Sequence, residues 1–176
     1  MAVLVEAISV IIKVSTINSK FPGGWSEFRD TVPDGTLCSD GELARLGFMT
    51  IEEAMAFIGG LEKIGFVHLA DGQPLDLAIA DQQRGFDTPC EWADFGRVNL
   101  DGHERKQIAA CRLAGSNEGI FLPDEWTYEK SLSSRFLYVS DGWVPESLEL
   151  LRHEEGLDVY RDLETGKELY VGRTDA

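Results

Sequence analysis

The sequence lacks the motifs that mark most metal sites, nucleotide sites and membrane spans. Its three cysteines, Cys38, Cys90 and Cys111, lie far apart without a Cys-x-x-Cys pair, so neither a zinc site nor a disulfide framework is expected. Neither Gly-x-x-x-x-Gly-Lys nor Gly-x-Gly-x-x-Gly occurs, which removes the usual nucleotide-binding loops. No apolar run approaches about 18 residues, so the sequence predicts no membrane span.

Basic residues are also scarce. The 176 residues include 31 acidic and 16 basic side chains, which gives a formal charge of −15. This charge would repel nucleic-acid phosphates and an anionic membrane surface, so neither is an expected partner. The excess is greatest between Glu118 and Glu164, and a large partner is therefore expected to be basic. The simpler interpretation is that the charge only keeps the protein in solution.

The sequence contains three histidines, which are possible metal ligands, and they are widely spaced. His68, His103 and His153 share no ligand-type spacing with one another or with the cysteines, so we expect no metal and no cofactor. The apolar N-terminus lacks the basic segment and cleavage site of a secretory signal and is interpreted as a strand. Unpaired cysteines fit a reducing compartment, and a cytoplasmic location is expected.

The first half of the chain alternates strand and helix signals. In order, these are a strand over Val3–Val14, helical pieces over Ser15–Lys20 and Trp25–Thr31, a hairpin of Thr36–Cys38 with Glu42–Met49, a capped helix from Thr50 to Gly65, and a strand over Phe66–Leu69. This order resembles the ferredoxin-like arrangement, an antiparallel sheet with two helices on one face. The resemblance implies an α+β fold and no activity, because the arrangement hosts many functions.

The second half is rich in hairpins. Strands are expected over Leu75–Ala80, Phe95–Leu100, Gln107–Leu113 and Phe136–Val139, a helix over Pro145–His153, and a terminal hairpin of Leu157–Asp162 with Glu168–Val171. We therefore divide the chain into a ferredoxin-like half, residues 1–85, and a hairpin-rich half, residues 86–176. The alternative is one continuous domain.

A polar cluster directly follows the apolar strand Leu75–Ala80. It consists of Asp81, Gln82, Gln83 and Arg84, and such groups at a strand end can line a ligand pocket. In the competing interpretation Asp81 caps a turn, and Arg84 forms a structural ion pair with Asp87 or Glu91.

Cys90 lies close to this polar cluster and could extend a pocket. It would act as a nucleophile if a neighbouring cation lowered the pKa of its thiol, but no local pattern supports this role. A free cysteine is more often a small buried apolar residue.

Aromatic and acidic side chains gather in the second half and suggest an interface. Aromatic anchors inside a charged rim hold protein partners tightly, although aromatic residues of this kind more often pack in a core or between elements. The candidate interface residues are Trp126, Tyr128, Trp143, Glu146, Glu149, Glu154 and Glu155.

Two functions follow from these patterns. The first is a non-catalytic acidic cytoplasmic binding protein, which resembles in composition the immunity proteins that block toxins with basic active sites. The second is a small-molecule pocket protein or enzyme that uses Asp81, Gln82, Gln83, Arg84 and Cys90. The sequence does not identify the oligomeric state, the partner or the ligand.

Overall fold

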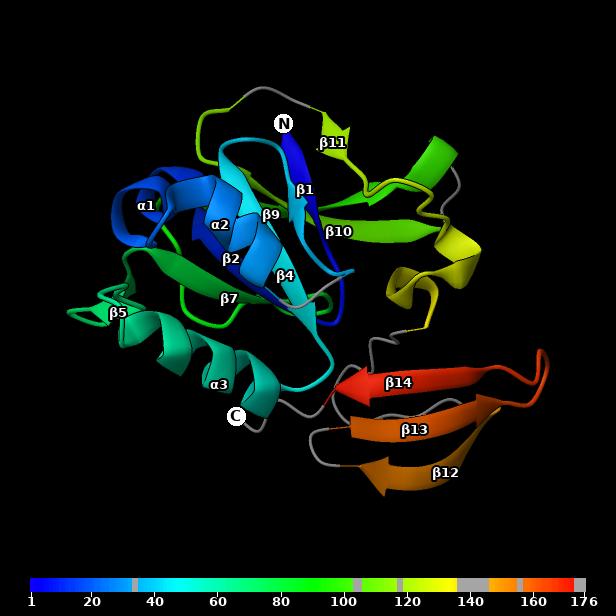
Figure 1. Ribbon diagram of the computed structural model, residues 1–176. Coiled ribbons are helices and arrows are strands. Elements are labelled where there is room, and N and C mark those ends of the chain that lie inside the picture. The colour runs from blue at the N-terminus through cyan, green and yellow to red at the C-terminus, as the bar shows by residue number, and fades with distance from the viewer. Residues whose placement is uncertain (33–34, 103–105, 117–118, 136–145, 155–156, 173–176) are drawn as a thin grey trace.

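The computed structural model describes residues 1–32, 35–102, 106–116, 119–135, 146–154 and 157–172. Within these ranges the chain forms three α-helices and fourteen strands, so the expected mixed α+β class is confirmed. Two sheets lie one on the other, helices cover the outer face of the larger sheet, and a small third sheet carries the C-terminal strands (Figure 1).

The larger sheet has five strands in the order β3-β4-β2-β7-β8, and all neighbouring pairs are antiparallel. Its strands are β2 (Ile8–Lys13), β3 (Cys38–Ser39), β4 (Leu43–Phe48), β7 (Leu77–Asp81) and β8 (Gly85–Phe86). The central strand β2 is buried on both faces, which explains its unbroken run of Val and Ile side chains.

The helices α1 (Val14–Lys20), α2 (Gly24–Thr31) and α3 (Ile51–Glu62) pack on one face of this sheet. Alternate residues of β2, namely Ile8, Val10 and Ile12, contribute to the core beneath the helices. Phe28 packs edge-on against Phe21, with ring centroids 5.1 Å apart. The expected capping box is confirmed, because Thr50 and Glu53 each accept a backbone N–H from the other residue at the start of α3.

A four-stranded sheet covers the opposite face of β2. Its order is β11-β1-β10-β9, with β1 (Ala2–Val5), β9 (Ala93–Asn99), β10 (Gln107–Leu113) and β11 (Ile120–Phe121). Side chains such as Val3, Ile11 and Cys111 form a second core between the two sheets. Strands from both halves of the chain pair in this sheet, since β1 pairs with β10 and β11.

The remaining strands form two small sheets. A short hairpin joins β5 (Leu69–Ala70) to β6 (Gln73–Pro74). The third sheet contains β12 (Leu148–Glu154), β13 (Leu157–Asp162) and β14 (Glu168–Gly172), which confirms the expected terminal hairpin. This sheet is tied to the rest of the chain by a 2.7 Å hydrogen bond from Tyr170 N–H to Arg135 C=O.

The helix expected over Pro145–His153 is wrong in its described part, because residues 148–154 form strand β12. Leu148 and Leu151 have helical spacing, but a β-bulge at Leu151 shifts the register between Leu150 and Arg152. Because of the one inserted residue, the side chains of Leu148 and Leu151 lie on the same face of the strand although they are three positions apart. The same three-residue spacing is typical of one face of a helix. The strand expected over Phe136–Val139 lies outside the described residues.

Two strand predictions need smaller corrections. The strand expected over Val3–Val14 is interrupted at Ala7, whose φ of 49° leaves the extended region. The strand expected over Phe66–Leu69 shrinks to Leu69–Ala70, because Val67 N–H donates to the Asp76 carboxylate at 2.7 Å. Among the described residues, no helix is long and apolar enough to span a membrane.

Candidate functional site

Ala7 separates β1 from β2 and is held by the side chain of Gln82. The Gln82 backbone N–H donates to Ala7 C=O at 2.9 Å, and Gln82 Oε1 accepts from Ala7 N–H, also at 2.9 Å. The Gln82 amide Nε2 donates to Ser133 C=O at 3.3 Å. The buried side chain of Gln82 thus holds the turn at Ala7. It also links this turn to Ser133, which lies 51 residues after Gln82 in the sequence.

Glu6, beside Ala7, is a buried carboxylate with several donors. Its Oε1 accepts hydrogen bonds from Ser133 N–H at 2.9 Å, Ser133 Oγ at 2.6 Å and Trp126 Nε1 at 3.2 Å. Its Oε2 lies 3.7 Å from Arg45 Nη2. Charge-assisted hydrogen bonds of this kind compensate for removing a carboxylate from water.

Arg45, on β4, completes this buried network and is only 3% exposed. Its Nε donates to Ser9 Oγ at 3.1 Å, and its Nη1 donates to Thr36 C=O at 3.0 Å. Burial lowers the pKa of the Arg45 guanidinium, and the Glu6 carboxylate opposes that shift.

Sequence reasoning missed Glu6 and Arg45. The available signal was a charged residue inside each apolar stretch of sequence, since Glu6 lies between Val5 and Ala7 and Arg45 between Ala44 and Leu46. The groups that bond to Glu6 and Arg45 all belong to this chain. Together these bonds hold the turn that contains Ser133 against the sheets. These contacts indicate a structural role.

The predicted polar cluster after β7 forms a tight turn. Asp81 Oδ1 accepts the backbone N–H of Gln83 at 2.6 Å and that of Arg84 at 3.3 Å, as an aspartate does when it caps a turn. Asp81 and Gln82 are buried, Gln83 is half-buried and Arg84 is exposed. The turn accounts for Asp81, and the contacts with Ala7 and Ser133 account for Gln82, while ligand binding at this cluster stays a prediction.

Cys90 lies half-buried at the edge of the core between the two sheets. Burial raises the pKa of the Cys90 thiol, which reduces its thiolate fraction at neutral pH. Cys38 and Cys111 are fully buried in the same core, and burial raises the pKa of each. All three cysteines are free thiols.

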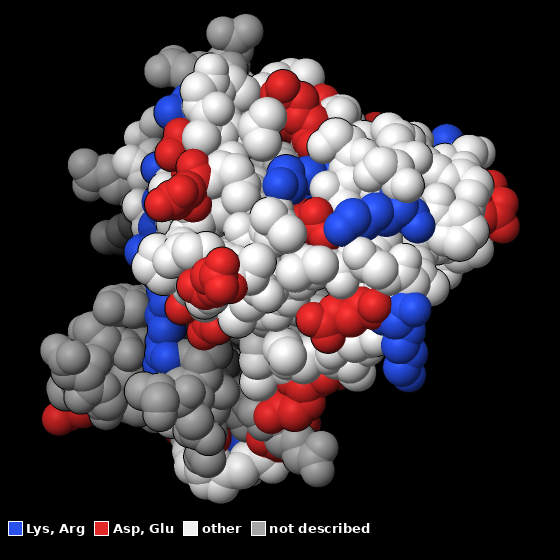
Figure 2. Space-filling model, turned by 90° about the vertical axis from the view of Figure 1, so that its left-hand side faces the viewer, with Lys and Arg blue, Asp and Glu red and all other residues white. Residues whose placement is uncertain are grey.

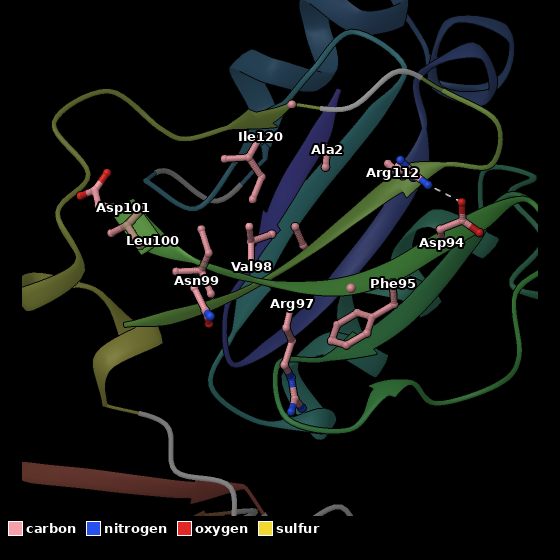
Figure 3. Close-up of a pocket in the computed structure, with 14 residues that line it drawn as sticks. Ala2, Asp94, Phe95, Arg97, Val98, Asn99, Leu100, Asp101, Arg112 and Ile120 are labelled. Carbon is pink, nitrogen blue, oxygen red and sulfur yellow. Dashed lines mark hydrogen bonds and ion pairs between the residues drawn. The ribbon is translucent and has the colours of Figure 1, made fainter. Parts of the chain in front are cut away.

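A cavity of about 490 Å³ lies on the outer face of the four-stranded sheet. Two of its lining residues contact the Asp81 to Cys90 segment, because Phe95 packs against Phe86 and Arg97 donates a hydrogen bond to Gln83 C=O. Its lining includes Asp94, Gly96 and Val98 of β9, and also Ala110 of β10. Gly96 pairs directly with Ala110, so small residues occupy neighbouring positions on two strands. Figure 3 shows Val98, Ala2 and Ile120 on one side of the β9 ribbon, with Phe95 and Arg97 on the other.

An ion pair lies at one end of this cavity. Arg112 Nε lies 3.3 Å from Asp94 Oδ2, across the paired strands β10 and β9 (Figure 3). Asp101 lies at the other end, beyond the last residue of β9. Apolar walls with a few polar groups suit binding, and none of these side chains forms a nucleophile and base pair.

The predicted interface residues are spread over several contacts. The Trp126 indole donates to Glu6, and the Tyr128 ring lies beneath Lys106 Nζ, 5.9 Å from the ring centroid. Glu149 pairs with Arg161, and Glu154 pairs with Arg152. Glu146 is exposed, whereas Trp143 and Glu155 lie outside the described residues, so a shared interface stays a prediction.

Acidic side chains do not merge into one patch on the face drawn in Figure 2, which is the left-hand side of the view in Figure 1. On this face they form separate groups among uncharged atoms, with basic side chains between them. Within the described ranges, no group of three or more His, Cys, Asp or Glu side chains has the geometry of a metal site.

Comparison with known proteins does not assign a family. No protein-family model matches the chain, and neither curated proteins nor solved structures show a significant match. Function is therefore inferred from the geometry and charge of this chain.

Proposed function

We propose that the chain is a non-catalytic acidic protein that binds a basic protein partner. The observation that carries this proposal is the excess of 31 acidic over 16 basic side chains. Complementary charge increases the association rate with a basic partner and disfavours acidic competitors.

The use of the buried polar side chains supports a non-catalytic role. Hydrogen bonds to groups inside the molecule occupy the side chains of Glu6, Arg45 and Gln82, so these side chains have a structural use. Burial raises the pKa of Cys90, the one cysteine of the three with a partly exposed side chain, which argues against an activated thiolate. A catalytic site would need groups that remain available to a substrate.

An immunity-type inhibitor is the class of acidic binding protein that we favour for this chain. Such a protein would cover a basic active site, and free cysteines fit the reducing cytoplasm in which it would act.

We also propose a ferredoxin-like arrangement for the larger sheet. Support comes from the strand order β3-β4-β2-β7, in which each neighbouring pair is antiparallel. The helices that follow β2 and β4 pack on the same face of the sheet, as in that arrangement.

Affinity capture from the native host at low salt, followed by titration with the purified captured protein, tests the proposed function. We expect a basic protein whose affinity falls steeply as salt increases, because ions screen exposed charges. Changing Glu146, Glu149 and Glu154 together to Gln should weaken this binding.

A matched triple variant with Glu27, Glu52 and Glu62 changed to Gln alters the net charge equally on the helices. Equal loss in both variants would indicate a general charge effect, and a larger loss in the first would favour the interface proposed from the sequence. Binding that does not change with salt would contradict a partner recognised by charge.

A further inference from the structure

β9 is an edge strand with one side of its backbone directed away from the sheet. Its register with β10 has no bulge over all seven residues. Leu100 N–H donates to Lys106 C=O, and Ala114 N–H donates to Trp92 C=O, so the even-numbered residues of β9 form the bonds to β10. The backbone groups of Phe95 and Asn99 consequently point outward, and no strand in the described part of the chain pairs with this edge.

The cavity lies along the same strand. Its lining includes every residue from Asp94 to Asp101, together with the outer face of β10. The small pair Gly96 and Ala110 leaves space above the sheet, and a Cβ atom at Gly96 would meet no other atom within 4 Å. A strand added beside β9 could therefore place alternate side chains in this space.

We propose that the outer edge of β9 and its adjoining groove bind an extended, basic peptide segment of a protein partner. This inference rests on the proposed function, since it names the segment through which a basic partner docks. Main-chain hydrogen bonds to Phe95 and Asn99 hold the segment, and its apolar side chains lie over Gly96 and Ala110. A segment of seven residues spans about 24 Å, the length of β9.

Charge selects a basic segment over other occupants of the groove. Asp101 lies beyond the end of β9, where it can meet a Lys or Arg side chain of the segment, whereas Asp94 at the opposite end already pairs with Arg112 (Figure 3). The lining also includes Arg97, so the preference for a basic segment comes mainly from the net charge of the whole chain. The net charge of −15 disfavours a second copy of this chain, which would bring equal negative charge to the same edge.

The test uses the full chain, labelled with ¹⁵N, and the capped peptide Lys-Val-Ser-Val-Ser-Val-Lys. We expect binding that shifts the amide signals of Phe95 and Asn99 and protects them from hydrogen exchange. The matched peptide with Glu at both ends should bind about fivefold or more weakly, because it loses the ion pair with Asp101 and is repelled by the net negative charge of the chain.

Two variants with a matched control separate docking at β9 from general effects. Asn99→Pro removes an N–H that does not bond to β10, whereas Asn99→Ala keeps it, so only the proline variant should lose peptide binding about tenfold. Gly96→Leu fills the groove and should weaken binding to a similar extent. Unchanged thermal midpoints show that both variants remain folded.

Failure to bind the Lys peptide, equal binding of the Glu peptide, or equal binding by Asn99→Pro and Asn99→Ala would overturn docking at β9. Dimerisation of the chain through this edge, detected as a doubled mass that Asn99→Pro abolishes, would also overturn it. If the captured partner binds in a salt-dependent manner but ignores Asn99→Pro and Gly96→Leu, only this inference fails. If its binding is independent of salt, the proposed function fails.

Discussion

The buried pair of Glu6 and Arg45 makes a strong prediction about stability. In Glu6→Gln the negative charge is lost while Arg45 remains 3% exposed, so a buried guanidinium loses its counter-charge. Breaking a buried ion pair in this way costs about 3 to 5 kcal/mol of unfolding free energy. We expect a value near the lower limit, because the glutamine oxygen can still accept one hydrogen bond from Ser133.

Urea unfolding followed by tryptophan fluorescence measures this loss. A cost of about 3 kcal/mol corresponds to a decrease of about 6 to 12 °C in the thermal midpoint of a chain of this size. The slope of the unfolding free energy against urea should not change, because the variant exposes the same surface on unfolding.

Glu154→Gln is the matched control, because Glu154 pairs with Arg152 on the surface. Exposed pairs contribute less than about 1 kcal/mol, so this variant should unfold almost as the parent does. In the double variant Glu6→Gln, Arg45→Met, removal of the unpaired charge should recover part of the lost stability. Equal stability of Glu6→Gln and Glu154→Gln would show that the buried pair of Glu6 and Arg45 stabilises the fold no more than an exposed pair does.

Three further predictions concern other parts of the fold. Thr50→Ala removes the cap of α3 and should cost about 1 kcal/mol in urea unfolding. In the folded chain Cys90 should react with a thiol reagent before the fully buried Cys111 does. Burial raises the pKa of Cys111 above its usual 9.0, so stability should fall as pH rises past that value, because only the unfolded chain releases the proton.

A control or a contradicting result checks each of these three predictions. Thr50→Ser keeps the capping hydroxyl and should cost less than Thr50→Ala, whereas equal losses would remove the cap as the cause. Cys111→Ala should show a smaller loss of stability at alkaline pH than the parent. Reaction of Cys111 at the rate of Cys90 would show that the core between the sheets opens readily.

Local signals in the sequence predicted several elements well. Thr50 and Glu53 indicated where α3 begins, and Asp40-Gly41 indicated the hairpin of β3 and β4, because each signal lies within a few residues of what it controls. The strand expected over Gln107–Leu113 coincides with β10.

Long-range strand pairing and irregular strands could not be predicted from local signals. Nothing local indicates that β1 pairs with β10, more than 100 positions along the chain. The bulge at Leu151 gave a strand the spacing of a helix. Glu6 and Arg45 are adjacent only after folding, and the cavity beside Gly96 combines small residues from several strands, which carry no motif.

The dissociation constant of the purified captured partner for the full chain, measured at low and high salt, tests most sharply whether this protein recognises a basic partner by charge. We predict a basic partner whose binding weakens steeply as salt rises, and weakens again when Asn99→Pro blocks β9. An acidic or neutral partner, bound equally tightly at both salt concentrations, would contradict this prediction.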